Sequence, residues 1–294
     1  MASVTSTGRR QSIDAQGDPL VPRMLLARRL RTLREAEGLT RRDAARAVGG
    51  STSKISRLEL GRSGYKAGDI AALLGRYGVD DDERATLLAL AEKTTARPWW
   101  YADRDIVPRW VQDYLSAEQA AKLVRTFEAQ FVPGLLQTED YARALIRRVN
   151  PEPEVDRRVE FRLRRQRVLR RRPRPLNLWV VLDEAALWRP IGDPETMRAQ
   201  IRHIADLCRR PNVTVQIAPF GICGRVAGDG PLTLVRFPQQ GLPDMVYLER
   251  ADSAVYPVRP RDVERHWHVF NTLVTEARPP EQTPHILAKV LTTY

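Results

Sequence analysis

Short hydrogen-bond donors and long cations gather on one side of a predicted helix, at Thr52, Ser53, Lys54 and Arg57. The other side of that helix carries Ile55 and Leu58, whose spacing places both on one face. A guanidinium group pairs with a guanine edge through two hydrogen bonds, and serine and threonine hydroxyls bond to several base edges. The chemistry that this set offers is hydrogen bonding to base edges in a major groove.

Two short helices joined by a glycine turn must position these side chains. Thr40 caps a predicted first helix over 41–48, and the glycines that follow close it. Ser51 or Thr52 caps a second helix over 53–60, which presents the donors and cations. The residues expected to form the core of this motif are Leu39, Ala45, Gly49, Ile55 and Leu58.

Further polar side chains beside the motif are placed to reach the phosphate backbone. Such contacts fix the orientation of a protein on a duplex without reading its sequence. Lys54 is long enough to reach either a base or a phosphate. The residues expected to contact phosphate are Arg41, Ser51, Arg62 and Lys66.

Three flanking helices, predicted at 24–37, 70–77 and 80–93, complete an all-α domain over 23–95. Arg34 is expected on the outer face of the first of them. This arrangement resembles the helix-turn-helix of the lambda-repressor/Cro-like family, also called the xenobiotic-response-element type. The resemblance implies a five-helix DNA-binding domain whose second motif helix enters the major groove. An ordinary helical hairpin on a basic surface is the alternative. The residues at family spacing are Leu39, Thr40, Ala45, Gly49, Ile55, Leu58, Glu59 and Gly61.

The positive net charge of the chain, although large, is only weak evidence for a polyanionic partner. The 294 residues carry a net charge of +12, and the pI is near 10.3. Nearly all of the positive charge is arginine, and an arginine- and alanine-rich bias also arises from GC-rich coding. The motif therefore carries the expectation of DNA binding more than the charge does.

The remaining composition favours a cytoplasmic, nucleoid-associated protein. No run approaches the ~18 apolar residues of a membrane span, and no apolar signal core is present near the beginning. Cys208 and Cys223 are too few for a disulfide scaffold or a thiolate zinc site, so we expect reduced, buried thiols. Residues 1–22 are expected to be a disordered tail.

A second domain is predicted over 110–294, after an aromatic-rich linker at 96–109. We expect helices over 108–130, 139–149 and 155–172. Short β-branched segments then alternate with apolar helical patterns, which predicts an α+β domain around a small sheet. The strands are expected at 177–183, 212–219, 231–237 and 245–249, and the helices at 194–208 and 260–277.

Five segments after the Cro-like domain carry a wider resemblance: FEAQFVPGLLQTEDYARAL, RRVEFRLRRQRVL, WVVLDEAAL, PNVTVQIAPF and GPLTLVRFP. In this order they are similar to the WhiJ-like regulators of actinobacteria, also described as Scr1-type and antitoxin-like. The resemblance implies a transcriptional regulator that is often paired with a small partner protein from a neighbouring gene. It implies no chemistry for the carboxyl-terminal domain.

The second domain lacks the sequence patterns of an enzyme. It has no Gly-x-Ser-x-Gly elbow, phosphate-cradling glycine loop or His-Glu-x-x-His motif, so we expect no catalysis, metal or cofactor. A ligand pocket is the stronger hypothesis, because polar side chains lie beside apolar faces of predicted helices. Buried polar groups need partners, which are either each other or a ligand. The candidate pocket residues are Glu128, Gln130, Gln137, Arg162 and Gln166.

Taken together, these patterns predict a sequence-specific, DNA-binding transcriptional regulator. One helix-turn-helix reads few base pairs, so we expect a homodimer, formed chiefly through the second domain, on an inverted-repeat operator. The arginine-rich helix 155–172 and the apolar helix 260–277 offer candidate dimer surfaces, and the former is alternatively a second DNA contact or a solvated face. The alternative function is an antitoxin-like interaction protein that holds a small partner and autoregulates through the same motif.

Overall fold

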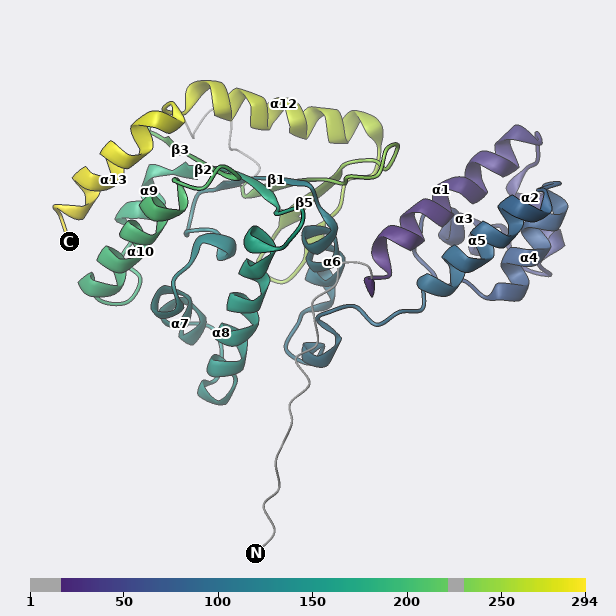
Figure 1. The fold of residues 1–294 in the computed structure, drawn as a ribbon, viewed down its shortest axis with the longest axis horizontal. Coiled ribbons are helices and arrows are strands. Elements are labelled where there is room, and N and C mark those ends of the chain that lie inside the picture. Colours follow the sequence, from purple (N-terminus) through teal and green to yellow (C-terminus); the bar gives the residue numbers. More distant parts are fainter. Residues whose placement is uncertain (1–16, 222–229) are drawn as a thin grey trace, which may run out of the picture. The chain divides into compact units, whose positions relative to one another are not determined.

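The computed structural model describes residues 17–221 and 230–294, and the chain divides into two units, Met1–Ala102 and Asp103–Tyr294 (Figure 1). The expected linker at 96–109 spans this division. Its last residues belong to the second unit, where Ile106 and Val107 are buried.

The described part of the first unit is helical and begins earlier than expected. The Asp18 carboxylate accepts a hydrogen bond from the Leu20 amide at 3.0 Å, and Pro22 suits a first helical turn because it has no N–H to satisfy. The prediction that a disordered tail extends to residue 22 is therefore wrong from Leu20 onward, and residues 1–16 lie outside the described part. The helices are α1 (Leu20–Ala36), α2 (Arg41–Ala47), α3 (Thr52–Glu59), α4 (Ala67–Arg76) and α5 (Asp81–Lys93).

Local caps set the ends of the two motif helices. Thr40 and Asp43 form a reciprocal capping box at the start of α2. Ser51, rather than Thr52, caps α3, because its side chain accepts from the Lys54 amide at 3.2 Å. Gly49 adopts a φ of 56°, which only glycine takes up readily, and so turns the chain between the helices.

An apolar core joins α2 and α3 to the other helices of this unit. Ala45, Ile55 and Leu58 are buried in it as expected, and Leu39 packs against it while remaining partly exposed. Ala45 is 4 % exposed and lies within this core, and because protein interiors are close-packed a larger side chain there would have to displace its neighbours.

A buried ion pair ties α1 to α3 and corrects the expectation for Arg34. Its guanidinium lies inside, with side-chain exposures of 8 % for Arg34 and 2 % for Glu59. Arg34 Nε donates to Glu59 at 2.5 Å, and its Nη1 donates to the Leu39 carbonyl at 2.7 Å. Arg34 leaves the outer face because it pairs with a carboxylate 25 positions later, which helical periodicity does not register.

We predict that Ala45→Leu destabilises the first unit by about 1–3 kcal/mol, because the added methyl groups have no space in the core. Calorimetric unfolding of the full chain measures the effect. Ala36→Leu, at the exposed end of α1, adds the same atoms outside the core and is expected to leave the transition unchanged. Equal melting temperatures for both variants would contradict the packing of α2 against α3.

The described strands of the second unit form one mixed sheet in the order β3-β2-β1-β4-β5-β6. Strands β1, β2 and β3 are parallel, whereas β4 pairs antiparallel with β1 and with β5. The strands are β1 (Leu123–Glu128), β2 (Asn177–Asp183), β3 (Val213–Ala218), β4 (Leu232–Arg236), β5 (Met245–Glu249) and β6 (Ala254–Val255).

The prediction of one helix over 108–130 is wrong. The helix α6 (Gln112–Ala120) ends where Ala121 becomes extended, and β1 follows as a central strand with a neighbour on each edge. Its side chains alternate: Val124 and Thr126 face one side of the sheet, and Arg125 and Phe127 the other. The conformation of this segment is determined by its pairing with strands that are distant in sequence and not by its local residue pattern.

Helices cover both faces of the sheet. After α6, the described helices of this unit are α7 (Glu139–Arg147), α8 (Glu152–Gln166), α9 (Glu184–Trp188), α10 (Pro194–Leu207), α12 (Pro260–Glu276) and α13 (Thr283–Leu291). In Figure 1, α12 crosses one face of the sheet, and α7, α8 and α10 lie against the other. Single 3₁₀ turns occur at Tyr101–Asp103, Arg109–Val111, Gly134–Leu136, Arg167–Arg170 and Pro280–Gln282.

Two surfaces expected to be free for dimerisation are used inside the unit. The apolar side of α12, with Phe270 and Leu273, is buried against the sheet. Most arginines of α8 bond to groups of their own domain; Arg157, for example, donates to the Asp105 carboxylate at 2.5 Å. The helical part of the predicted segment 155–172 also begins earlier, at Glu152, and tightens into a 3₁₀ turn after Gln166.

Candidate functional site

The outer side of α3 presents the side chains expected to read base edges. Thr52, Ser53 and Arg57 are all exposed. Within the described residues, Arg57 has no ion-pair or hydrogen-bond partner for its guanidinium, so all its donors are free. Ile55 and Leu58 anchor the opposite side in the core and fix the direction in which these donors point.

Lys54, unlike Thr52, Ser53 and Arg57, already has a charged partner within the domain. Its ammonium forms an ion pair with Asp69 in the first turn of α4, at 2.8 Å. The lysine therefore links α3 to α4, and a contact with a base or phosphate requires this pair to break.

The side chains expected at phosphate also differ in how free they are. Arg41 Nε donates to the buried Glu59 at 3.1 Å, although the arginine side chain is 44 % exposed. Ser51 is engaged as the cap of α3. Arg62 and Lys66, in the loop after α3, are exposed and have no ion-pair partner in the described part of the chain.

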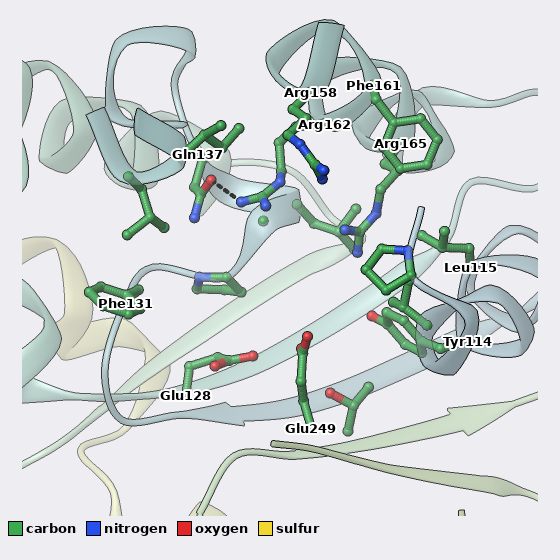
Figure 2. A pocket seen from close by; sticks show the side chains of 18 of the residues that line it. Tyr114, Leu115, Glu128, Phe131, Gln137, Arg158, Phe161, Arg162, Arg165 and Glu249 are labelled. Carbon is green, nitrogen blue, oxygen red and sulfur yellow. Dashed lines mark hydrogen bonds between the residues drawn. The ribbon is translucent and has the colours of Figure 1, made fainter. Parts of the chain in front are cut away.

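The second unit has a partly open cavity of about 420 Å³ between the sheet and α8. Its volume lies within the roughly 300–1,000 Å³ range of small-molecule sites. Figure 2 shows arginines on one side and glutamates on the opposite side, with all of their polar ends directed into the space between.

The acidic side follows one row across the sheet. Thr126 on β1 stands opposite Thr233 on β4, which stands opposite Tyr247 on β5. Two residues further along β1 and β5, on the same face, lie Glu128 and Glu249. Both carboxylates therefore close the same edge of the sheet, two strands apart.

The basic side is one face of α8. Its arginines stand at positions i, i+4 and i+7, which share a helical face. Each of the outer two already has a carboxylate partner: Arg158 pairs with Glu154 at 2.6 Å, and Arg165 with the buried Glu118 at 2.8 Å. Arg162 differs, because its Nη1 donates to the neutral Gln137 amide oxygen at 2.6 Å. No carboxylate among the described residues pairs with it.

Burial shifts the proton affinity of the two unpaired groups in opposite directions. Burial, and secondarily the nearby charge of Glu249, raises the pKa of Glu128 to about 8. Burial also lowers the pKa of Arg162 to about 10, and the neighbouring Arg165 acts in the same direction. Both shifts reflect a charged group partly removed from water that has no ion-pair partner among the described residues.

The polar residues predicted for a pocket separate into two groups. Glu128, Gln137 and Arg162 all line the cavity. Gln166 lies beside it and donates to the carbonyls of Gly134 and Gln137, so it fixes the neighbouring turn. Gln130 is exposed. Mutual hydrogen bonding therefore accounts for Gln166, whereas Glu128 and Arg162 keep unused bonding capacity.

Several cavity residues were not found from the sequence. Arg158 and Arg165 could be predicted from the sequence, because they stand four positions before and three positions after Arg162 and therefore share its face of the helix. Glu249 and Tyr247 carried none, since they reach the cavity only through the pairing of β5 with β4.

Other candidate chemistry in the described residues is limited. No group of three or more His, Cys, Asp and Glu side chains there could hold a metal ion. None of the described helices is both long and apolar enough to cross a membrane. Cys208 is a free, partly buried thiol whose pKa is raised by burial to about 11, and Cys223 lies outside the described residues.

Comparison with known families places both units. Residues 25–87 match the helix-turn-helix domain family, so the protein is a DNA-binding regulator of the helix-turn-helix class. Residues 111–289, more than half of the chain, match the family described as a domain of unknown function (DUF5753). The chain belongs to that family. No curated protein and no solved structure matches the chain.

We predict that Glu128 makes stability fall with rising pH. The folded pKa of about 8 exceeds the unfolded value of about 4.5, so between these values the folded state holds the extra proton. Relative to Glu128→Gln, the wild type should lose about 1 kcal/mol of unfolding free energy per pH unit from pH 5 to pH 8.

Denaturant titrations at a series of pH values measure this difference. Glu160→Gln, on the exposed side of α8, removes an equivalent carboxyl group and is expected to give a constant difference from the wild type. A Glu128→Gln curve that stays parallel to the wild type would mean that the Glu128 carboxyl is ionised throughout.

Proposed function

We propose that this chain is a sequence-specific transcriptional regulator that reads the major groove with α3, and that its second domain binds rather than catalyses. The observation that carries the proposal is the exposed, donor-rich side of α3. Arg57 suits bidentate pairing with guanine, and Thr52 and Ser53 suit adaptable hydrogen bonds. Arg62 and Lys66 are placed to contact phosphate. Lys54 pairs with Asp69 and Arg41 with Glu59, so in the protein without DNA these two cations stabilise the motif itself.

We predict that Arg57→Ala weakens binding to a mapped operator by about 1–3 kcal/mol and relaxes the preference at one base pair. The reason is the loss of a bidentate contact that only one base pair offers. Operator sites are mapped by immunoprecipitation sequencing in the native host, and affinities are measured by titration at fixed salt.

Arg28→Ala is the matched control, because Arg28 is exposed on α1 and carries the same charge. It is expected to lower specific and non-specific affinity alike and only slightly. If Arg57→Ala weakened operator and random DNA equally, Arg57 would contact phosphate only.

We further propose a homodimer on an inverted-repeat operator. A single helix-turn-helix reads few base pairs, and two-fold dimers place two reading helices in successive major grooves. The resemblance to WhiJ-like regulators supports a regulatory role but leaves the antitoxin-like alternative, in which the second domain holds a small partner protein.

We predict that the full chain is a dimer in light scattering and that a chain ending at Thr95 is a monomer that binds operator weakly. The second unit, Asp103–Tyr294, holds most of the residues and is the expected site of self-association. A monomeric full chain on a non-palindromic site would contradict this, and co-purification with a small protein from the host would then favour the antitoxin-like alternative.

A further inference from the structure

We propose that the cavity between the sheet and α8 binds a small zwitterion of short-peptide size. Its carboxylate would lie on Arg162, and its ammonium group between Glu128 and Glu249. This proposal concerns the second domain alone and does not depend on how α3 reads DNA.

Arg162 supplies the anion site. A guanidinium group carries five N–H donors, and the hydrogen bond with Gln137 uses only one nitrogen. Arg165, by contrast, already has a counter-charge in Glu118, to which it donates two hydrogen bonds, at 3.0 and 2.8 Å. A planar carboxylate matches the free edge of Arg162 and would supply the missing counter-charge.

Glu128 and Glu249 supply the cation site. They end strands β1 and β5, which flank β4, so their backbones are separated by two strand spacings, about 10 Å. Among the described residues, the Glu128 carboxylate accepts a hydrogen bond from the Thr126 hydroxyl, at 3.2 Å, and no cation there forms an ion pair with either carboxylate. An ammonium group, with three donors, bonds to oxygen atoms on both sides at once.

The volume of the cavity and its opposed charges limit the size of the ligand. The arginines and glutamates face each other from opposite sides of the cavity (Figure 2). In a free α-amino acid one carbon separates the two charged groups, whereas each added residue extends the separation by roughly 3.3–3.6 Å. The cavity between these walls has a volume of about 420 Å³, which has room for a dipeptide or a molecule of similar size.

The wall between the charged groups suits an aromatic or aliphatic side chain. Tyr114 and Tyr247 stack with ring centroids 4.4 Å apart, and Phe131 and Phe161 also line the space. The Tyr247 hydroxyl forms no hydrogen bond of normal geometry among the described residues, and burial, with the nearby Glu249 carboxylate, raises its pKa. A peptide amide or carbonyl of the ligand would give this hydroxyl a well-aligned partner.

The test uses the purified full chain and a panel of dipeptides that contain Phe, Tyr, Leu or Ala, each added separately. A rise in melting temperature identifies the dipeptides that stabilise the protein, and calorimetry measures their affinity. The best dipeptide is then compared with its N-acetylated and its carboxamide forms. We expect binding by the free dipeptide and at least tenfold weaker binding by each blocked form.

Variants assign each end of the ligand. Arg162→Gln should abolish the preference for the free carboxylate over the carboxamide, and Glu128→Gln the preference for the free amine over the acetylated form. The exposed Arg167→Gln and Glu160→Gln serve as matched controls and should keep both preferences. If a cavity variant fails to fold, the blocked peptides on the wild type still decide the proposal.

Proton release gives an independent readout. Binding of an ammonium group at pH 7 should ionise Glu128, so the binding enthalpy should depend on the ionisation enthalpy of the buffer, and this dependence should disappear in Glu128→Gln. The proposal would be overturned if no dipeptide of the panel bound, or if the free and the blocked forms bound with equal affinity.

Discussion

Strand β1 is hydrogen-bonded on both edges, to parallel β2 and to antiparallel β4, and this double pairing is the constraint on which the second domain depends. It joins the parallel part of the sheet to the antiparallel part and fixes which side chains face each layer. Because β5 runs in the direction of β1, Glu128 and Glu249 finish at one edge. Ligands in open α/β sheets bind at this type of edge, outside the carboxyl ends of strands where the connections change direction.

Helix α8 completes the cavity and also holds the segment where the chain enters the second domain. On one face Arg162 looks into the cavity, and on another Arg164 bonds to the buried Asp103 at 2.5 Å. Arg158 belongs to both, since it lines the cavity and donates to the Ile106 carbonyl at 2.8 Å. A rotation of α8 therefore moves the cavity wall and the start of the domain together.

Local chemistry was readable from the sequence, and long-range pairing was not. Strands β2 and β5 match their predicted ranges, because short apolar, β-branched runs stand between turn residues. Serine and threonine caps likewise placed the motif helices to within a residue. The local pattern of β1 predicts helix, because the residues that pair with it on the sheet come more than 50 positions later. The same separation hid the burial of Arg34 and the convergence of Glu249 on the cavity.

Arginine does more in this molecule than set its net charge. Arg34 and Arg158 each hold a carboxylate and a backbone carbonyl at once, which the forked guanidinium permits and a single ammonium does not. Only Lys54, Lys66, Lys93, Lys122 and Lys289 are lysines. Exchange of the buried arginines for lysine would preserve the isoelectric point yet leave carbonyls unbonded, so the shortage of lysine is in part a requirement of the interior.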